Sequence, residues 1–295
     1  MARTFVILNP NSGKGRGRRL EPQIRSVFAN QAAEFGLTTK AGDEERLARQ
    51  AVESGFERIV AVGGDGTTSN VAHAIMETGR RNVSLALVPG GTGCDLARTL
   101  DIPQNDLERC AAIVAAGKTK PIDVGKVEGR HFLNVAGFGF DIAVLERSFK
   151  VKWLRGELLY LYCALLEMKA YPGFRLDSSL DGSLGPSGTH MMVIVANAKK
   201  FGGGFAVAPD ASLDDGQLDI VTFGDLGFFA RLKAMGALMK GEHNQLAQIG
   251  TRRAARAVFQ FDAPPSFETD GEWRQALSSS LTIETLPRAL NVLVP

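Results

Sequence analysis

The sequence predicts an α/β domain with a parallel sheet, followed by a second domain that is a mostly antiparallel β-sandwich. Residues 1–122 alternate short apolar strands with helical segments, and several glycine-rich turns follow these strands directly. From about residue 123 onward, one β-type segment follows another. The length of 295 residues also favours two domains, at about 100–200 residues per domain.

The first domain is expected to be built from strands that are linked through helices. The expected elements are, in order, a strand Thr4–Leu8, a helix through Leu20, Ile24, Val27 and Phe28, a helix from Asp43 through Val52, a strand Arg58–Val62, a helix through Val71, Ala74 and Ile75, and a strand Val83–Val88. Strands connected in this way are parallel and are covered by helices on both faces.

The second domain is expected to contain short strands separated by turn signals such as Asp181-Gly182 and Asp215-Gly216. The β-type segments are 122–128, 131–136, 174–180, 189–196, 217–223, 255–261 and 280–286. Helical stretches are expected at about 141–171 and 226–240, and Ser183–Gly188 is expected to be an exposed loop.

Composition excludes several classes of protein. The 34 basic and 32 acidic residues give a net charge of +2, too balanced for a nonspecific nucleic-acid binder, so no nucleic-acid partner is expected. The three cysteines are odd in number and widely spaced, which argues against a disulfide framework or a zinc ribbon and favours a reducing cytoplasm. No segment reaches the roughly 18 apolar residues of a spanning helix, so no transmembrane segment is expected.

A glycine-rich turn follows the first expected strand. Asn9-Pro10-Asn11-Ser12-Gly13-Lys14-Gly15 precedes a helix, where main-chain N–H groups can bind phosphate. It is not a Walker A loop, because the upstream glycine and the Ser or Thr after the lysine are missing. A plain strand-to-helix turn remains the alternative.

Two further glycine-rich turns follow the next strands. Gly63-Gly64-Asp65-Gly66-Thr67 and Pro89-Gly90-Gly91-Thr92-Gly93 stand at the carboxyl ends of expected central strands, where open α/β sheets bind ligands. Asp65 and Asp95 bring two carboxylates to this edge, and Thr92 could donate to a phosphate oxygen. The alternative in both cases is a tight turn with a capped helix.

A fourth segment, Thr269-Asp270-Gly271-Glu272, lies in the β-rich part of the chain. Its spacing alone favours a hairpin turn.

These four segments, in this order, resemble the diacylglycerol kinase catalytic-domain family of lipid kinases. Further similar segments are Asp123-Val124-Gly125, Phe132-Leu133-Asn134, Gly202-Gly203-Gly204, Ala208-Pro209-Asp210-Ala211 and Asp214-Asp215-Gly216. The Gly63–Thr67 motif alone is also shared with NAD kinases, which have a related fold. The resemblance implies that ATP binds in a cleft between an α/β domain (residues 1–122) and a β-sandwich domain (residues 123–286), with a final strand in 287–295 returning to the first domain.

The resemblance also implies roles for individual residues. Nucleotide contacts would come from Asn9, Ser12, Gly13, Thr38, Gly64, Asp65, Gly66, Thr67, Thr68, Ser69, Asn70 and Thr92. Asp65, Asp95 and Asp123 would organise the Mg2+ that accompanies ATP. A structural Mg2+ would take the Asp215 carboxylate and the carbonyls of Ser212 and Gln217, which are oxygen ligands as a hard cation prefers. Glu272 would be the base that accepts the proton of the lipid hydroxyl, with Asp270 in support.

Two positions depart from the family pattern. The family has Asn-Glu where this chain has Ser69-Asn70, and it has Asn where this chain has Cys94. Both changes remove polar groups near the expected nucleotide without touching the expected metal carboxylates.

A lipid substrate requires contact with a membrane surface. Lys150, Lys152 and Arg155 beside Trp153, followed by Leu158–Leu166, could form an interfacial helix, with an ordinary core helix as the alternative. The expectation is a cytoplasmic, peripherally membrane-associated lipid kinase that forms phosphatidic acid from diacylglycerol; a homodimer is left open. The competing hypotheses are a soluble NAD-kinase-like enzyme and a non-enzymatic nucleotide-binding lipid sensor.

Overall fold

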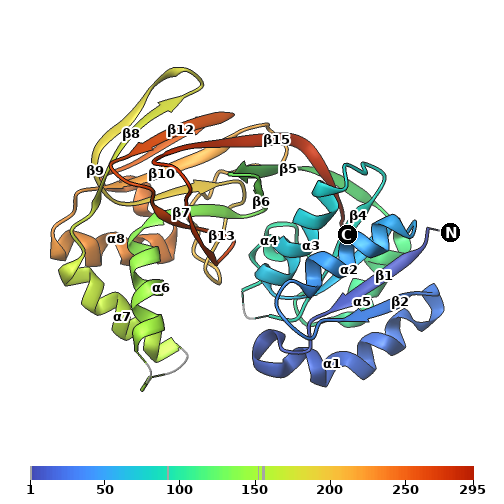
Figure 1. The fold of residues 1–295 in the computed structure, drawn as a ribbon. Coiled ribbons are helices and arrows are strands. Elements are labelled where there is room, and N and C mark those ends of the chain that lie inside the picture. Colours follow the sequence, from blue (N-terminus) through green and yellow to red (C-terminus); the bar gives the residue numbers. More distant parts are fainter. Residues whose placement is uncertain (1, 92, 152, 155–156) are drawn as a thin grey trace.

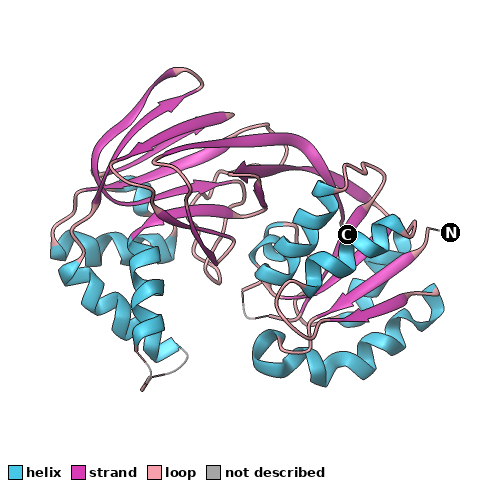
Figure 2. Cartoon of the chain, in the orientation of Figure 1, coloured by secondary structure: helices cyan, strands magenta, loops and turns pink. Residues whose placement is uncertain are grey.

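The computed structural model describes residues 2–91, 93–151, 153–154 and 157–295 and has two lobes (Figure 1). One lobe combines parallel strands with helices, and the other is mostly antiparallel (Figure 2). The predicted fold class is therefore confirmed.

The first lobe contains a parallel sheet whose strands lie in the order β2, β1, β3, β4. Its strands are β1 (Thr4–Leu8), β2 (Glu34–Leu37), β3 (Arg58–Gly63) and β4 (Ser84–Pro89), and its helices are α1 (Ser12–Phe28), the 3-10 turn η1 (Ala29–Gln31), α2 (Asp43–Glu53), α3 (Asp65–Glu77), α4 (Asp95–Thr99) and α5 (Leu107–Ala116). Helix α2 packs against α3, and α1 against α5. Right-handed crossovers place these two pairs on opposite faces of the sheet, as expected for a buried parallel sheet.

The second lobe is built from antiparallel strands with three helices along one side (Figure 1). Its strands are β5 (Thr119–Val127), β6 (Arg130–Phe132), β7 (Val135–Gly139), β8 (Phe174–Leu180), β9 (Ser183–Ala196), β10 (Leu218–Gly224), β11 (Ile249–Ala254), β12 (Arg256–Phe261), β13 (Ser266–Thr269), β14 (Glu272–Gln275) and β15 (Ser280–Leu293). Its helices are α6 (Phe140–Lys150), α7 (Glu157–Ala170) and α8 (Phe228–Lys240), with the 3-10 turn η2 (His243–Gln245).

Three clusters of buried side chains form the hydrophobic cores of the two lobes. One lies in the first lobe around β1, β3 and β4. A second lies among the second lobe's strands and contains Phe138, whose ring contacts those of Phe259 and Phe267. The third lies beneath the helices and contains Phe140, Met168 and Leu238. The described part of the chain contains no helix that is long and apolar enough to cross a bilayer.

Strands β5 and β15 form a ribbon that joins the lobes (Figure 1). The first half of β15 pairs with β12, and its end pairs in parallel with β4, through Asn291 opposite Ser84. The register of the ribbon shifts between Leu286 and Leu290. At this irregularity the buried carboxylate of Asp123 accepts the N–H of Arg288 at 2.7 Å.

Two details of the expected second domain are wrong. Ser183–Gly188 is not a loop but the first half of β9, because the turn at Asp181-Gly182 has positive φ at both residues and pairs Leu180 directly with Ser183. The single helical stretch expected at 141–171 is two helices, because the chain leaves helical geometry at Val151 (φ −92°, ψ 105°). Strands β2 and β11 and helix α5 were not expected from the sequence. Strands β13 and β14 flank the hairpin turn that spacing predicted at Thr269–Glu272, and α4 is the helix that the alternative interpretation placed after Pro89–Gly93.

Candidate active site

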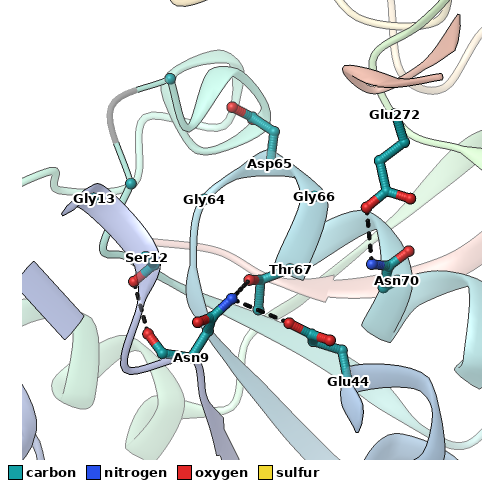
Figure 3. Close-up of a pocket in the computed structure, with 12 residues that line it drawn as sticks. Asn9, Ser12, Gly13, Glu44, Gly64, Asp65, Gly66, Thr67, Asn70 and Glu272 are labelled. Carbon is teal, nitrogen blue, oxygen red and sulfur yellow. Dashed lines mark hydrogen bonds between the residues drawn. The ribbon is translucent and has the colours of Figure 1, made fainter. Parts of the chain in front are cut away.

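A pocket of about 380 Å3 opens at the carboxyl ends of β1 and β3. With the strand order β2, β1, β3, β4, the connections leave β1 and β3 in opposite directions, which is the switch point at which open α/β sheets bind ligands. The pocket is lined by Asn9, Ser12, Gly13, Glu44, Gly64, Asp65, Gly66, Thr67, Asn70, Gly91, Gly93 and Glu272 (Figure 3). It therefore gathers three of the four glycine-rich segments with one residue of the fourth.

The glycine-rich turns pack main chain against main chain at the floor of this pocket. A Cβ on Gly91 would lie 2.5 Å from the Cα of Gly64, and a Cβ on Gly13 would lie 2.4 Å from the carbonyl oxygen of Gly90. Gly13 also has a left-handed conformation (φ 56°), as does Lys14 (φ 58°). Such strain in a non-glycine residue costs about 1–3 kcal/mol and concentrates at functional sites. Only glycine lets the three loops come together in this way.

Polar side chains fasten the first loop to the second. The Asn9 amide donates to Thr67 Oγ1 and to Glu44 Oε1, each at 3.1 Å (Figure 3). Ser12 Oγ donates to the carbonyl of Asn9 at 2.9 Å. These bonds fix the mouth of the pocket between α1 and α3.

The Asp65 carboxylate, at the start of α3, is held by the loop that follows β4. It accepts the main-chain N–H of Cys94 at 2.7 Å and that of Asp95 at 2.8 Å. Burial, with the neighbouring Asp95 carboxylate, raises the pKa of Asp65 to about 6. Asp95 itself accepts from Arg98 at 3.1 Å and from the N–H of Gly203 at 2.8 Å, which links the first lobe to the second.

The Thr269–Glu272 segment is a hairpin turn and also reaches the pocket. Thr269 pairs with Glu272, so Asp270-Gly271 is a two-residue turn, and both residues have positive φ (50° and 87°), as a type I′ turn requires. The hairpin and catalytic interpretations of this segment are therefore compatible.

Asp270 is buried and supports the neighbouring main chain. Its carboxylate accepts the N–H groups of Leu133, Asn134 and Val135 at 2.8–3.1 Å, and it also bonds to the side chain of Ser69 on α3. Burial raises its pKa in spite of these bonds. Asp270 thus connects the hairpin with both lobes but does not line the pocket.

Glu272 projects into the pocket from the second lobe, opposite α3 (Figure 3). Its Oε1 accepts the Asn70 amide at 3.0 Å, and its Oε2 accepts Arg274 at 3.2 Å. A Cβ on Gly66 would lie 3.2 Å from Oε1, so this carboxylate rests directly on the second loop. The side chain remains 40% exposed, which leaves it accessible to a bound molecule.

The remaining predicted residues lie outside the pocket lining. Thr38, Thr68, Ser69 and Asp95 are bonded to residues at the end of β1, in the loops or in the hairpin: Thr38 donates its N–H to the Leu8 carbonyl, Thr68 to Gly64 and Asp95 to Asp65, and Ser69 bonds to Asp270. Asp123 is fully buried at the ribbon between the lobes, where it accepts N–H groups of Gly216 and Arg288. Ser212, Asp215 and Gln217 share one short, partly exposed segment, in which Asp215 Oδ1 accepts the N–H of Gln217 at 3.0 Å. Thr92 lies outside the described residues.

Sequence reasoning missed Glu44, Arg130 and Arg274. Glu44 stands in the first turn of α2, where an acidic residue is ordinary, so its sequence position carries no functional signal. Arg130 pairs with Glu45 and bonds to Asn70 Oδ1. The two departures from the family pattern also have partners: Asn70 contacts Glu272, and the Cys94 thiol lies 3.6 Å from the Gly63 carbonyl.

The charges of the pocket restrict what it can hold. Glu44, Asp65 and Glu272 line it together with glycines of the three loops. Three carboxylates repel a bare polyphosphate, so such a ligand requires divalent cations between the acidic groups and its own oxygens. An all-oxygen donor set suits Mg2+.

Comparisons with known proteins cover the whole chain. Residues 3–127 match the family model of the diacylglycerol kinase catalytic domain, and residues 134–294 match that of the YegS C-terminal NAD kinase beta sandwich-like domain. The chain is 31% identical to a diacylglycerol kinase of Bacillus subtilis, over 100% of this chain and 97% of the relative. A crystal structure of a diacylglycerol kinase from Bacillus anthracis superposes with a TM-score of 0.81 at 25% identity, covering 99% of this chain and 97% of the other. An NAD kinase from Archaeoglobus fulgidus, solved in complex with ATP, shares the fold, with a TM-score of 0.57 at 14% identity over 99% of this chain and 93% of the other.

Proposed function

Since the chain belongs to the diacylglycerol kinase catalytic-domain family, we propose that it is an ATP-dependent lipid kinase that converts diacylglycerol to phosphatidic acid. The observation that carries this proposal is the pocket at the switch point, where three glycine-rich loops meet the Glu272 carboxylate from the other lobe. We assign residues 1–122 and 287–295 to the nucleotide-binding domain and residues 123–286 to the lipid-substrate domain.

The phosphates of ATP would lie on the loops of the first lobe. Gly13, Gly64 and Gly66 line the pocket, and a glycine has no side chain that would keep a ligand away from its main-chain N–H group. Mg2+ would neutralise the phosphate charge between Asp65 and the nucleotide. The ATP complex of the NAD kinase with this fold supports the use of a nucleotide here.

Glu272 would accept the proton of the lipid hydroxyl. It is the pocket carboxylate contributed by the second lobe, and Asn70 and Arg274 orient its two oxygens. Asp270 would hold the turn that carries Glu272, because it binds the main chain of residues 133–135. Phosphoryl transfer depends mainly on such positioning and on charge neutralisation.

A second Mg2+ would stabilise the second lobe at Asp215. The Asp215 carboxylate and the Ser212 and Gln217 carbonyls belong to one short, partly exposed segment, and the donor set is all oxygen, as Mg2+ requires. The residues present therefore fit the ion.

The helices of the second lobe would bring the enzyme to a bilayer as a peripherally associated cytoplasmic protein. Phe149, Trp153, Leu165, Phe229 and Met239 on and beside these helices are 53–82% exposed. Exposed lysines stand near them, at positions 150, 169, 233 and 240. Aromatic side chains interleaved with lysines are typical of interfacial helices. Lys152 and Arg155 lie outside the described residues.

The test of this function is phosphorylation of a lipid panel with labelled ATP and Mg2+, using the wild-type chain and Glu272→Gln. General-base assistance contributes typically 10²–10⁴-fold, so we expect turnover to fall by about that factor while ATP binding, measured by titration, changes little. Glu108→Gln, an exposed glutamate on α5, is the matched control and should retain full turnover.

The outcomes separate the alternatives. Normal turnover of Glu272→Gln together with loss in Asp270→Asn would make Asp270 the base. Normal turnover of both variants would show that the Asp270–Glu272 hairpin has no catalytic role. Phosphorylation of NAD in place of any lipid would establish the soluble NAD-kinase-like alternative, and nucleotide binding without any phosphorylation would establish the sensor.

A further inference from the structure

A cluster of two histidines and a glutamate lies where α3 meets β6, outside the pocket. His73 and Glu77 are four residues apart on α3, so they share one face of the helix, and His131 stands on β6. His73 Nδ1 lies 3.0 Å from His131 Nδ1, and Glu77 Oε1 lies 3.7 Å from the same His131 nitrogen. One nitrogen from each ring and one carboxylate oxygen all lie within 4.8 Å of one another.

A histidine ligates a metal as the neutral ring, and the burial of both rings favours that form. Burial, with the neighbouring His73, lowers the pKa of His131 to about 4. Burial, with the Arg130 guanidinium, also lowers the pKa of His73. The two Nδ1 atoms lie at hydrogen-bond distance, so one ring donates to the other in the metal-free protein. A bound metal would replace this hydrogen bond, with both rings protonated at Nε2 instead.

Two of the three separations are close to those around a tetrahedral metal ion, and the third is within 4.8 Å. Zinc binds imidazole nitrogen and carboxylate oxygen at about 2.0–2.2 Å, which puts neighbouring ligand atoms about 3.3–3.5 Å apart. The observed 3.0 Å and 3.7 Å lie on either side of this value, so small rotations of side chains would complete the geometry. Glu77 is partly exposed, which gives an ion a route from solvent.

We propose that His73, Glu77 and His131 form a binding site for Zn2+ or a similar divalent transition metal, with water in the fourth position. Two imidazoles and one carboxylate favour such a metal over Mg2+, which prefers oxygen ligands. Three cationic side chains act on the two rings: Arg130 and Arg274 on His73, and Lys126 and Arg130 on His131. Arg130 and Arg274 are each paired with a carboxylate, Glu45 and Glu272 respectively, which limits their repulsion of the ion. Lys126, in contrast, lies opposite His131 in the β5–β6 ladder and weakens the site by its charge.

The location gives the metal a consequence for the pocket. Helix α3 carries Asn70, one turn before His73, and Asn70 holds Glu272 Oε1. Arg130, next to His131, also bonds to Asn70. A metal that joins α3 to β6 would therefore fasten the two lobes beside the carboxylate that we assign as the base.

The test measures metal binding by the tag-free full chain in excess Mg2+, without ATP or lipid. We expect one equivalent of Zn2+ in competition with a chromophoric chelator, a melting temperature that rises with Zn2+, and visible absorption bands when Co2+ is used instead. His73→Gln and Glu77→Gln should lower Zn2+ affinity by more than the roughly 10–100-fold that accompanies loss of an outer-sphere partner.

Matched controls separate this site from surface binding. His190→Gln changes a histidine that bonds to Gly188, and Glu53→Gln changes an exposed glutamate on α2, so both should bind Zn2+ like the wild type. Equal Zn2+ affinity in His73→Gln and the wild type, or no Zn2+ binding by the wild type, would overturn the proposal. Since no substrate is present, either result leaves the kinase assignment standing, and a failed kinase assay leaves the metal site standing.

Discussion

Substituting Asp65 separates its proposed metal role from its support of the fold. Its carboxylate accepts the N–H groups of Cys94 and Asp95, both of which are buried residues. Asparagine keeps one acceptor oxygen, whereas alanine keeps none. A buried N–H without a partner costs about 1–3 kcal/mol, so Asp65→Ala should be less stable than Asp65→Asn by about that amount.

The pH dependence of stability provides a second measure. Because the pKa of Asp65 is raised from 3.8 to about 6 in the folded chain, the native state binds this proton more tightly than the unfolded state. The stabilisation of the folded chain by the protonated Asp65 carboxyl group is therefore fully present below pH 3.8 and is lost as the pH rises through about 6. The raised pKa lowers the free energy of unfolding by about 3 kcal/mol at neutral pH, compared with its value below pH 3.8. Asp65→Asn carries no charge at any pH, so this pH dependence disappears. At neutral pH the absence of the buried charge stabilises the variant and the loss of one acceptor oxygen destabilises it. These effects roughly cancel, so its stability at neutral pH should lie close to that of the wild type.

The assay is urea unfolding between pH 4 and pH 8 at constant Mg2+, with turnover measured on the same preparations. We expect Asp65→Asn to be folded at neutral pH but unable to phosphorylate lipid, with a flatter pH dependence than the wild type. Full turnover by Asp65→Asn would refute the metal role. Equal stability of Asp65→Ala and Asp65→Asn would refute the claim that this carboxylate holds the loop after β4.

Three more substitutions test other parts of the structure. Gly91→Ala places a Cβ 2.5 Å from the Cα of Gly64, so we expect a loss of about 1–3 kcal/mol in urea unfolding and weaker ATP binding by titration. Glu268→Gln should flatten the fall in melting temperature as the pH rises above about 6, since burial raises the pKa of Glu268 and of its neighbour Asp141 (to about 6), and the variant leaves one ionisable carboxyl group in place of two. Asp215→Ala should abolish the rise in melting temperature that excess Mg2+ gives the wild type.

Each of these has a result that contradicts it. Gly236→Ala, in α8 with no atom within 4 Å of the added Cβ, is the control for Gly91→Ala. Equal stability and equal ATP affinity of the two variants would mean that the loops can move apart without loss. An equally steep or steeper fall in melting temperature for Glu268→Gln would mean that ionisation of this carboxyl group does not destabilise the fold. An unchanged Mg2+ response in Asp215→Ala would make residues 212–217 an ordinary turn.

Local patterns explain the part of the fold that could be predicted. The apolar runs of β1, β3 and β4 are buried on both faces, and their composition alone identifies them as strands of a parallel sheet. Strand β14 and the first half of β9 carry polar and exposed residues, and they are strands only because neighbouring strands pair with them. That information lies in the partner strand and not in the segment itself.

The site shows the same division. Motif order identified Asp65 and Glu272, because each stands beside glycines whose backbone freedom the loops require. The order of the motifs could not predict Glu44 or Arg130, because their proximity to the pocket depends on how α2 and β6 pack against α3. Asp123 illustrates the reverse case: it stands in a recognisable motif, yet its carboxylate is occupied by main-chain N–H groups at the joint between the lobes.

The long strand β15 also constrains the order in which the chain can fold. The parallel sheet is complete only when Asn291 and Val292 lie beside Ser84 and Leu85, so its last strand comes from a part of the chain synthesised more than two hundred residues later. During synthesis β4 therefore keeps one edge unpaired while the entire second lobe emerges. Contacts of such long sequence separation form slowly, and an open strand edge invites pairing with other chains. The first lobe should accordingly depend on chaperones, or on rapid completion of the ribbon, to avoid aggregation before its edge is closed.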